Sequence, residues 1–188
     1  MPALRASATL FALLLAACGP AQEAPNPNAT PGAAGCAPGG QAYLRARLRG
    51  AIEADLDWRD AEMSCEGGLR PDGSGLRLAI AGPLKTSGQK LRFVFGIDTV
   101  RKDGHETNAA TNLTLIVEGA QQLYATLGND KCTTDTLERG AIGSDTASRQ
   151  PVLVRGFCTG PAATMDGGSR VLVERFDFTT SYPTGNAP

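Results

Sequence analysis

Residues 41–60 read QAYLRARLRGAIEADLDWRD, and apolar and charged side chains alternate along this stretch. The apolar side chains share one parity: Leu44, Ala46, Leu48, Ile52, Ala54, Leu56 and Trp58. The charged side chains Arg45, Arg47, Glu53, Asp55 and Asp57 share the other parity. A period of two is typical of a β-strand with one buried face. The stretch therefore predicts β-strands and indicates an all-β domain built around them.

A hairpin is the favoured arrangement of this stretch. A three-residue loop of Arg49, Gly50 and Ala51 would set Leu48 opposite Ile52, Arg47 opposite Glu53, Arg45 opposite Asp55 and Leu44 opposite Leu56. Opposed charges across a strand pair contribute about 0.2–1 kcal/mol each. The alternative is one long strand bent at Gly50. The carboxylates Asp55, Asp57 and Asp60 are interpreted as a solvated sheet face, because a calcium site needs six or more converging oxygens.

The rest of the chain also has the pattern of short strands joined by turns. Glycine and proline together make 23 + 12 = 35 of 188 residues, which favours short strands joined by turns. Further strands are expected at 76–80, 90–97, 112–117, 122–127, 152–158 and 171–178. Residues 128–150 are expected to form a long polar excursion, and residues 179–188 to fray. Eight or nine short strands without a helix predict an antiparallel sandwich or barrel-like sheet.

The N-terminal segment has the layout of a secretory signal. Arg5 is followed by an apolar run over residues 6–17, which is too short to cross a bilayer as a helix. The run ends in Leu15-Ala16-Ala17-Cys18, which resembles the lipobox of bacterial lipoproteins. The resemblance implies cleavage before Cys18 and attachment of acyl chains to that residue, which hold a protein firmly on a membrane. The alternative is an ordinary signal peptide with an incidental cysteine.

These features divide the chain into four parts. Residues 1–17 form the signal peptide, and residues 18–40 the lipidated cysteine with a disordered spacer rich in proline, glycine and alanine. Residues 41–183 form the β-domain, and residues 184–188 a frayed end. In the lipoprotein family Gly19, in place of aspartate after the cysteine, favours the outer membrane. The domain would then face the periplasm or the cell surface.

The domain carries a second resemblance. The stretches DWRDAEMSCEGGLRPDGSGLRL, NLTLIVEG, GFCTGPA and RFDF look like those of small proteobacterial lipoproteins. The resemblance covers most of residues 50–180. It implies no catalytic residue, because that family offers none.

Four cysteines remain if Cys18 is lipidated: Cys36, Cys65, Cys132 and Cys158. Export places them in an oxidising compartment, where an even number favours two disulfides. Three connectivities are possible. A four-thiolate metal site is the rival, but no two of these cysteines are closely spaced. The expected pairs are Cys36 with Cys65, where a bridge would fasten the spacer to the sheet, and Cys132 with Cys158, where a bridge would close the polar excursion.

Composition and motifs exclude several function classes. The cleaved chain would carry 18 − 1 = 17 basic and 19 acidic side chains, which gives no reason to expect nucleic acid. His105 is the single histidine, so a two-histidine metal site is excluded and no cofactor is expected. Asp98 with Glu106 or Asp103 is the least implausible carboxylate pair for hydrolysis of a sugar polymer. The aromatic side chains Trp58, Tyr43, Tyr124 and Tyr182 could stack on sugar rings, although the parity of Trp58 favours burial.

Two functions follow as hypotheses. The favoured one is an envelope lipoprotein anchored through Cys18, with a non-catalytic β-domain that binds or supports an envelope protein or glycan. The alternative is a carboxylate-based hydrolase acting on cell-wall or extracellular polymer. A flat charged sheet would favour binding, whereas a concave cluster of ionisable groups would favour the enzyme.

Overall fold

The structure is a computed structural model, and it describes residues 35–98, 104–140 and 149–183. Cys18, the expected signal peptide, most of the expected spacer and Asp103 lie outside the described residues. Within the described part the chain is all-β and antiparallel, with only two three-residue 3-10 helices, η1 (Pro38–Gly40) and η2 (Asp60–Glu62). The predicted fold class is therefore confirmed at the level of an all-β antiparallel sheet.

In the described residues, twelve strands pair into a single sheet. In chain order they are β1 (Tyr43–Gly50), β2 (Ala54–Arg59), β3 (Ser64–Leu69), β4 (Gly75–Leu84), β5 (Gln89–Asp98), β6 (His105–Glu106), β7 (Ala109–Glu118), β8 (Gln122–Ala125), β9 (Cys132–Arg139), β10 (Arg149–Cys158), β11 (Ala162–Ala163) and β12 (Arg170–Pro183). This number exceeds the eight or nine that were predicted.

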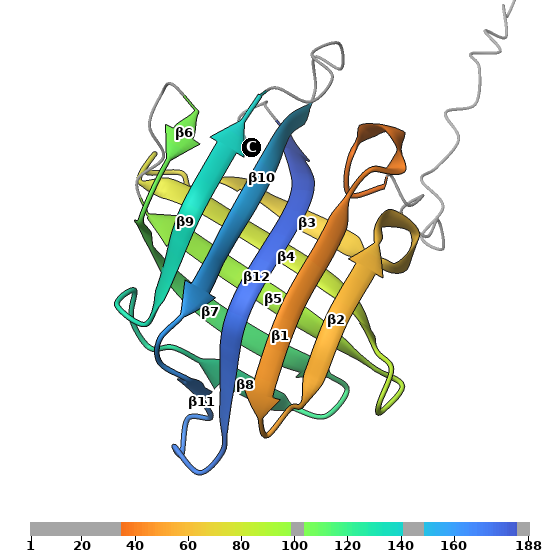
Figure 1. The fold of residues 1–188 in the computed structure, drawn as a ribbon, viewed down its shortest axis with the longest axis vertical. Helices are drawn as coiled ribbons and strands as arrows, with labels where there is room; N and C mark the ends of the chain where they lie inside the picture. The colour runs from red at the N-terminus through yellow and green to blue at the C-terminus, as the bar shows by residue number, and fades with distance from the viewer. Residues whose placement is uncertain (1–34, 99–103, 141–148, 184–188) are drawn as a thin grey trace, which may run out of the picture. The chain divides into compact units, whose positions relative to one another are not determined.

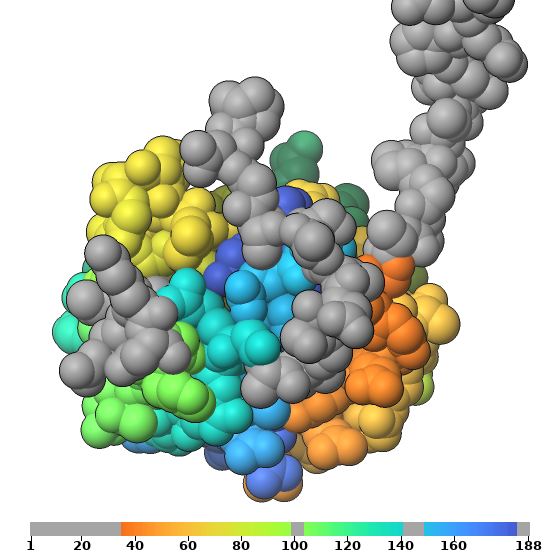
Figure 2. All heavy atoms as spheres, turned by 90° about the horizontal axis from the view of Figure 1, so that it is seen from above, coloured from red at the N-terminus to blue at the C-terminus, as the bar shows by residue number. Residues whose placement is uncertain are grey.

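The sheet folds over on itself into two layers that cross each other (Figure 1). One layer contains β2, β1, β12, β10 and β9, and the other contains β3, β4, β5, β7 and β8. The layers join along one edge of β7, which pairs first with β9 and then with β8, and β11 in turn pairs with both β8 and β12. Viewed from one end, β9 and β10 lie side by side, and β1 lies farther along the same side of the molecule (Figure 2), because β12 pairs with both β10 and β1.

The space between the layers is filled by aromatic and aliphatic side chains. Five aromatic residues in it are at most 1% exposed: Trp58, Phe93, Phe95, Phe176 and Phe178. Their rings contact one another in a chain, with centroid distances of 5.8 Å from Trp58 to Phe93, 5.8 Å from Phe93 to Phe95 and 4.7 Å from Phe95 to Phe178. Such ring pairs add stability beyond the area that they bury. The apolar parity seen in the sequence therefore marks the face of each strand that points into this core.

The hairpin predicted for residues 41–60 is present as β1 and β2, but its predicted register is wrong by two residues. Arg45 lies opposite Asp57 and Arg47 opposite Asp55, so the loop has five residues instead of three. The loop is longer because β1 continues to Gly50 by pairing with β12, and the N–H of Ala51 donates to the carbonyl of Arg170 at 2.9 Å. A shift of two residues keeps every side chain on its predicted face. The bent single strand is excluded.

Four strands were missing from the prediction: β3, β6, β9 and β11. The most important is β9, which lies inside the expected polar excursion over residues 128–150. Its inward side chains are Cys132, Thr134 and Leu137, all at most 2% exposed, so only one of the three is a large aliphatic side chain. The last strand also extends beyond its predicted end, since residues 179–182 are buried and pair with β10 rather than fray.

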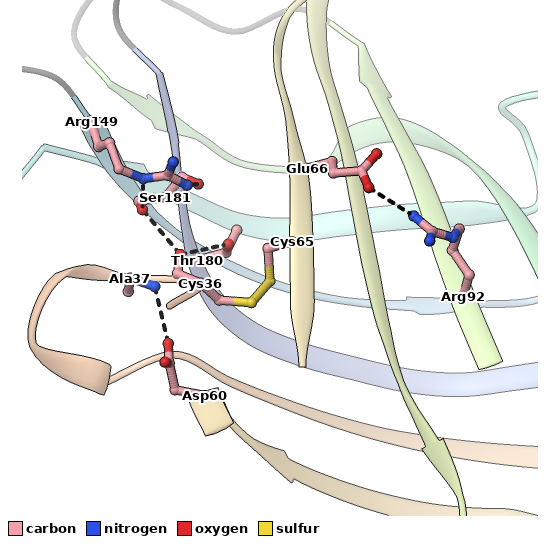
Figure 3. The surroundings of a disulfide bond; sticks show 9 residues. All are labelled: Cys36, Ala37, Asp60, Cys65, Glu66, Arg92, Arg149, Thr180 and Ser181. Atoms are coloured by element: carbon pink, nitrogen blue, oxygen red, sulfur yellow. Dashed lines mark hydrogen bonds and ion pairs between the residues drawn. A yellow bond between two sulfur atoms is a disulfide. The ribbon is translucent and has the colours of Figure 1, made fainter. Parts of the chain in front are cut away.

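Both expected disulfides are present, Cys36–Cys65 and Cys132–Cys158, as predicted. The first fixes the residues before β1 to β3 (Figure 3). The carbonyl of Cys36 also accepts hydrogen bonds from the N–H of Ser181 at 2.8 Å, the hydroxyl of Ser181 at 3.0 Å and the hydroxyl of Thr180 at 3.1 Å. The N–H of Ala37 donates to Asp60 Oδ1 at 3.1 Å. The expected spacer reached to Gly40, whereas Cys36 and Ala37 are already buried in the core.

Candidate functional site

The outer face of the layer that contains β2, β1, β12 and β10 carries a dense set of charges. We call it the charged face, and it consists of Arg45, Arg47, Arg49, Asp55, Asp57, Arg59, Arg155, Glu174, Arg175 and Asp177. These residues alternate along each strand with the apolar residues that enter the core, except at the bulge in β12. Pairing of the strands then sets the charged positions beside one another.

One row of this face crosses four strands with charges of alternating sign. Asp57 on β2 lies opposite Arg45 on β1, Arg45 opposite Asp177 on β12, and Asp177 opposite Arg155 on β10. The Arg45 Nε atom lies 3.5 Å from Asp57 Oδ1, and the Arg155 Nε atom 3.6 Å from Asp177 Oδ1. The hydroxyl of Tyr43 donates to Asp177 Oδ1 at 2.8 Å. Every charge in the row therefore faces an opposite charge.

The next row ends in an arginine that has no carboxylate partner in the described part of the chain. Arg47 Nε lies 3.2 Å from Asp55 Oδ1 and 3.9 Å from Glu174 Oε2. An irregularity in the pairing of β1 with β12 sets Arg47 directly opposite Arg175. Among the described residues, Arg175 makes no ion pair. It lines a shallow hollow of about 220 Å³ together with Arg45, Arg47, Asp55 and Asp57.

The titration of two groups reflects this arrangement. Desolvation works to raise the pKa of Asp55, but hydrogen bonds from Arg49 and Arg47 and their positive charges outweigh it and hold that pKa below its usual range. Burial, followed by the hydrogen bond to Asp177, raises the pKa of Tyr43. Both groups thus keep one protonation state around neutral pH, with Asp55 ionised and Tyr43 neutral. The face presents a fixed pattern of charges.

A groove runs beside the free edge of β2. This strand pairs with β1 on one side, and no described strand pairs with its other side. The groove has a volume of about 200 Å³ and lies between residues 54–58 of β2 and residues 83–86 at the end of β4. Its lining includes Leu56, Trp58 and Leu84. The indole N–H of Trp58 donates to the carbonyl of Pro83 at 2.9 Å, which ties the two sides of the groove together.

Asp98, the carboxylate considered for hydrolysis, is occupied by structural contacts. Arg70 Nη1 donates to Asp98 Oδ1 at 2.9 Å, and Asn129 Nδ2 donates to Asp98 Oδ2 at 2.6 Å. The contact with Arg70 joins the turn after β3 to the end of β5. Gly96 leaves room for it, because a Cβ atom there would lie 2.7 Å from Arg70 Nη2. Both carboxylate oxygens of Asp98 therefore already accept hydrogen bonds.

The other residues noted in the sequence fall in different places. Glu106 and His105 form β6, where His105 lies opposite Glu138. Tyr124 and Tyr182 are each 2% exposed, and with Trp58 they belong to the core. Of the four aromatic residues considered for stacking on sugars, only Tyr43 is not buried; it lies on the charged face.

The carboxylates Asp55, Asp57 and Asp60 do not converge. Asp55 and Asp57 face arginines, while Asp60 accepts the N–H of Ala37. Among the described residues, no group of three or more His, Cys, Asp or Glu side chains is placed to hold a metal ion.

Only the part of this site that lies on β1 and β2 could be predicted from the sequence. The alternation over residues 41–60 predicted the charged side of β1 and β2. The β12 and β10 half was missed, although the stretch VERFDF carries its own alternation. The groove at β2 could not be predicted, because its far wall comes from the end of β4 in the other layer.

No helix in the part of the chain that the structure describes is long and apolar enough to span a bilayer. Comparison with protein-family models, with curated proteins and with solved structures finds no match to this chain.

Proposed function

We propose that the protein is an envelope lipoprotein, anchored through Cys18, whose non-catalytic β-domain binds another envelope component through the charged face. The anchor rests on Leu15-Ala16-Ala17-Cys18, and Gly19 favours the outer membrane. The partner is an envelope protein or a glycan. The membrane contact is made by the lipid, and neither nucleic acid nor a cofactor is part of the proposal.

The single observation that carries the binding role is the charged face itself. Exposed ion pairs contribute little to stability, typically about 0–1 kcal/mol each. A face with ten charged side chains on four strands is therefore poorly explained by folding alone. Patterned charges on a rigid surface instead give a partner its orientation and exclude wrong partners. The strands below are fixed by a buried aromatic core, so little ordering cost opposes binding.

The anchored arrangement suits this role. The proposed spacer ends next to Cys36, where a disulfide and hydrogen bonds to β12 hold the chain. A pulling force on the lipid anchor would then be transmitted to β3 through the disulfide and to β12 through the hydrogen bonds. In this proposal the domain keeps its fold while it is tethered and bound.

Two measurements test the proposal. Labelled palmitate should enter the wild-type protein, and Cys18→Ala should abolish the label. The lipidated protein should then capture a component from detergent-solubilised envelope. Capture should weaken in Arg45→Glu, while Asp135→Lys on β9, a charge reversal outside the charged face, should retain it.

The opposite results would be decisive. Label that persists in Cys18→Ala would overturn the anchor. Capture that is equal in Arg45→Glu would overturn the binding face. Turnover of peptidoglycan or polysaccharide that is lost in Asp98→Asn would favour the hydrolase instead.

A further inference from the structure

We propose that the free edge of β2 binds an extended peptide strand that carries two basic side chains separated by one apolar side chain. The peptide would extend the sheet by one strand. The inference rests on the proposed function and narrows the partner to a protein with such a segment. Three observations carry it: the open edge, the charges at that edge and the groove beside it.

The edge is able to accept a strand. In an antiparallel strand, the N–H and C=O groups of alternate residues point away from the paired neighbour. β2 spans Ala54–Arg59 and pairs with β1 alone among the described strands. An exposed edge of this kind is a template for pairing with another chain, and several peptide-recognition domains use it.

The charges at the edge specify the partner. The alternating row described above ends at β2 on Asp57, and the neighbouring row ends there on Asp55. Arg45 and Arg59 already contact Asp57, and Arg47 and Arg49 contact Asp55. The two carboxylate side chains are still 52% and 66% exposed, and each carboxylate has about four acceptor sites, so both can accept a further cation. A strand that continues the alternation must place a cation opposite each carboxylate, two positions apart. β1 already offers this pattern on the other side of β2, as Arg45-Ala46-Arg47.

The groove specifies the residue between the two cations. Side chains of an added strand alternate between the two faces, so the middle side chain points toward the core side. There it meets the apolar lining of the groove, formed by Leu56, Trp58 and Leu84. The hollow of about 200 Å³ has room for an aliphatic side chain such as valine. Lys85 and Thr86 lie at its rim and are exposed.

The test uses the full-length lipidated protein in detergent and synthetic peptides. The basic probe is acetyl-Thr-Val-Lys-Val-Lys-Val-Thr-amide, and the acidic probe has glutamate in place of both lysines. The basic probe should bind at least about ten-fold more tightly, because two attractive charge pairs become repulsive in the acidic one. Methylation of alternate peptide nitrogens in the basic probe should weaken binding by a similar factor, since those N–H groups complete the strand pairing.

A charge swap on the protein completes the test. The double variant Asp55→Lys with Asp57→Lys should bind the acidic probe more tightly than the basic one. Asp135→Lys reverses one charge outside the charged face and should leave the wild-type preference unchanged. The two peptide controls leave the protein untouched, so a folding defect in the double variant does not decide the outcome.

Equal affinity for the two probes, or full binding by the methylated probe, would overturn the inference. So would self-association of the wild-type protein that is lost in the double variant, because the occupant would then be a second copy of the chain. If capture from envelope still requires Arg45 while neither probe binds, the peptide inference fails and the proposed function stands. If neither probe binds and nothing is captured, both fail.

Discussion

Removal of the Cys36–Cys65 disulfide should destabilise the domain by a predictable amount. The bridge joins residues 29 apart, and the chain-entropy model gives about 3.6 kcal/mol at 25 °C for a loop of that length. For a domain of this size the loss corresponds to a fall in Tm of about 7–14 °C. The variant Cys36→Ala with Cys65→Ala tests it. Urea unfolding can be followed by the fluorescence of Trp58, which is the only tryptophan and is buried.

The second disulfide provides the matched control. Cys132 and Cys158 are 26 residues apart, so their removal should cost about 3.5 kcal/mol. They lie directly opposite each other in the ladder between β9 and β10, so strand pairing still holds that region in the folded state. The segment before β1 has no such ladder. Hydrogen exchange of residues 37–42 should therefore accelerate only when the first bridge is removed.

A loss below about 1 kcal/mol for the first pair would refute the entropic reasoning. Faster exchange of residues 37–42 in both double variants would refute the claim that the first bridge holds the entry of the chain. Either result would also argue against the proposal that force on the lipid anchor is transmitted to the sheet through Cys36.

Three further changes test the register, the packing and the electrostatics. Arg45→Glu should destabilise the domain by about 0.5–1 kcal/mol, and Asp57→Arg in that background should restore part of the loss, whereas additive effects in the double-mutant cycle would contradict the observed pairing. Gly82→Ala should cost about 1–3 kcal/mol because the new Cβ would lie 2.5 Å from the buried indole ring, while Gly68→Ala has nothing within 4 Å and should change stability by less than about 1 kcal/mol in urea unfolding. The backbone N–H and hydroxyl of Ser74 hold the pKa of Asp72 below its ordinary value of 3.8, so the stability that this carboxylate adds is present above pH 3.8 and is lost as the pH falls through its folded pKa. Wild-type protein should therefore lose more stability than Asp72→Asn between about pH 5 and about pH 2.5, and equal losses would show that this carboxylate carries no such linkage.

Local patterns predicted the faces of the strands but not their partners. In β1 and β2 the parity assigned the core and surface side chains correctly, whereas Asp60, expected on the solvated sheet face, lies in η2 and accepts the N–H of Ala37. The register failed because β12, more than a hundred residues away, extends β1 to Gly50 and so lengthens the loop. A slip of two residues leaves the parity unchanged, so the local pattern cannot detect it.

The missing strands have a related cause. β9 buries Thr134 and Cys132 where a strand usually buries aliphatic side chains. Thr134 tolerates burial because its hydroxyl pairs with that of Thr111 at 2.9 Å, a contact between strands distant in sequence. Likewise Thr180 and Ser181 were expected to fray, but the carbonyl of Cys36 satisfies their hydroxyls. The disulfides could be predicted because four cysteines allow only three pairings, and their positions at the two ends of the expected loops favoured one of them.

In the candidate site too, the local sequence predicted which side chains are exposed but not which strands lie beside them. Asp55 and Asp57 were predicted to be exposed on a sheet, and they are. Their rows continue onto β12 and β10 through pairing that no local pattern encodes, and the groove adds Leu84 from the other layer. The candidate site is therefore a product of the fold, although Arg45, Arg47, Asp55 and Asp57 could be assigned to its exposed face from the sequence.

Site-specific photo-crosslinking in the native cell tests the central claim, that this surface binds an envelope component, most directly. A photoreactive side chain at Thr86, on the rim of the groove, should give a discrete adduct in the envelope fraction. The same group at Asp135, outside the charged face, should not give that adduct, and charge reversal of Asp55 and Asp57 should abolish it at Thr86. Equal adducts at the two positions, or none at Thr86 while the protein remains in the envelope, would contradict the account.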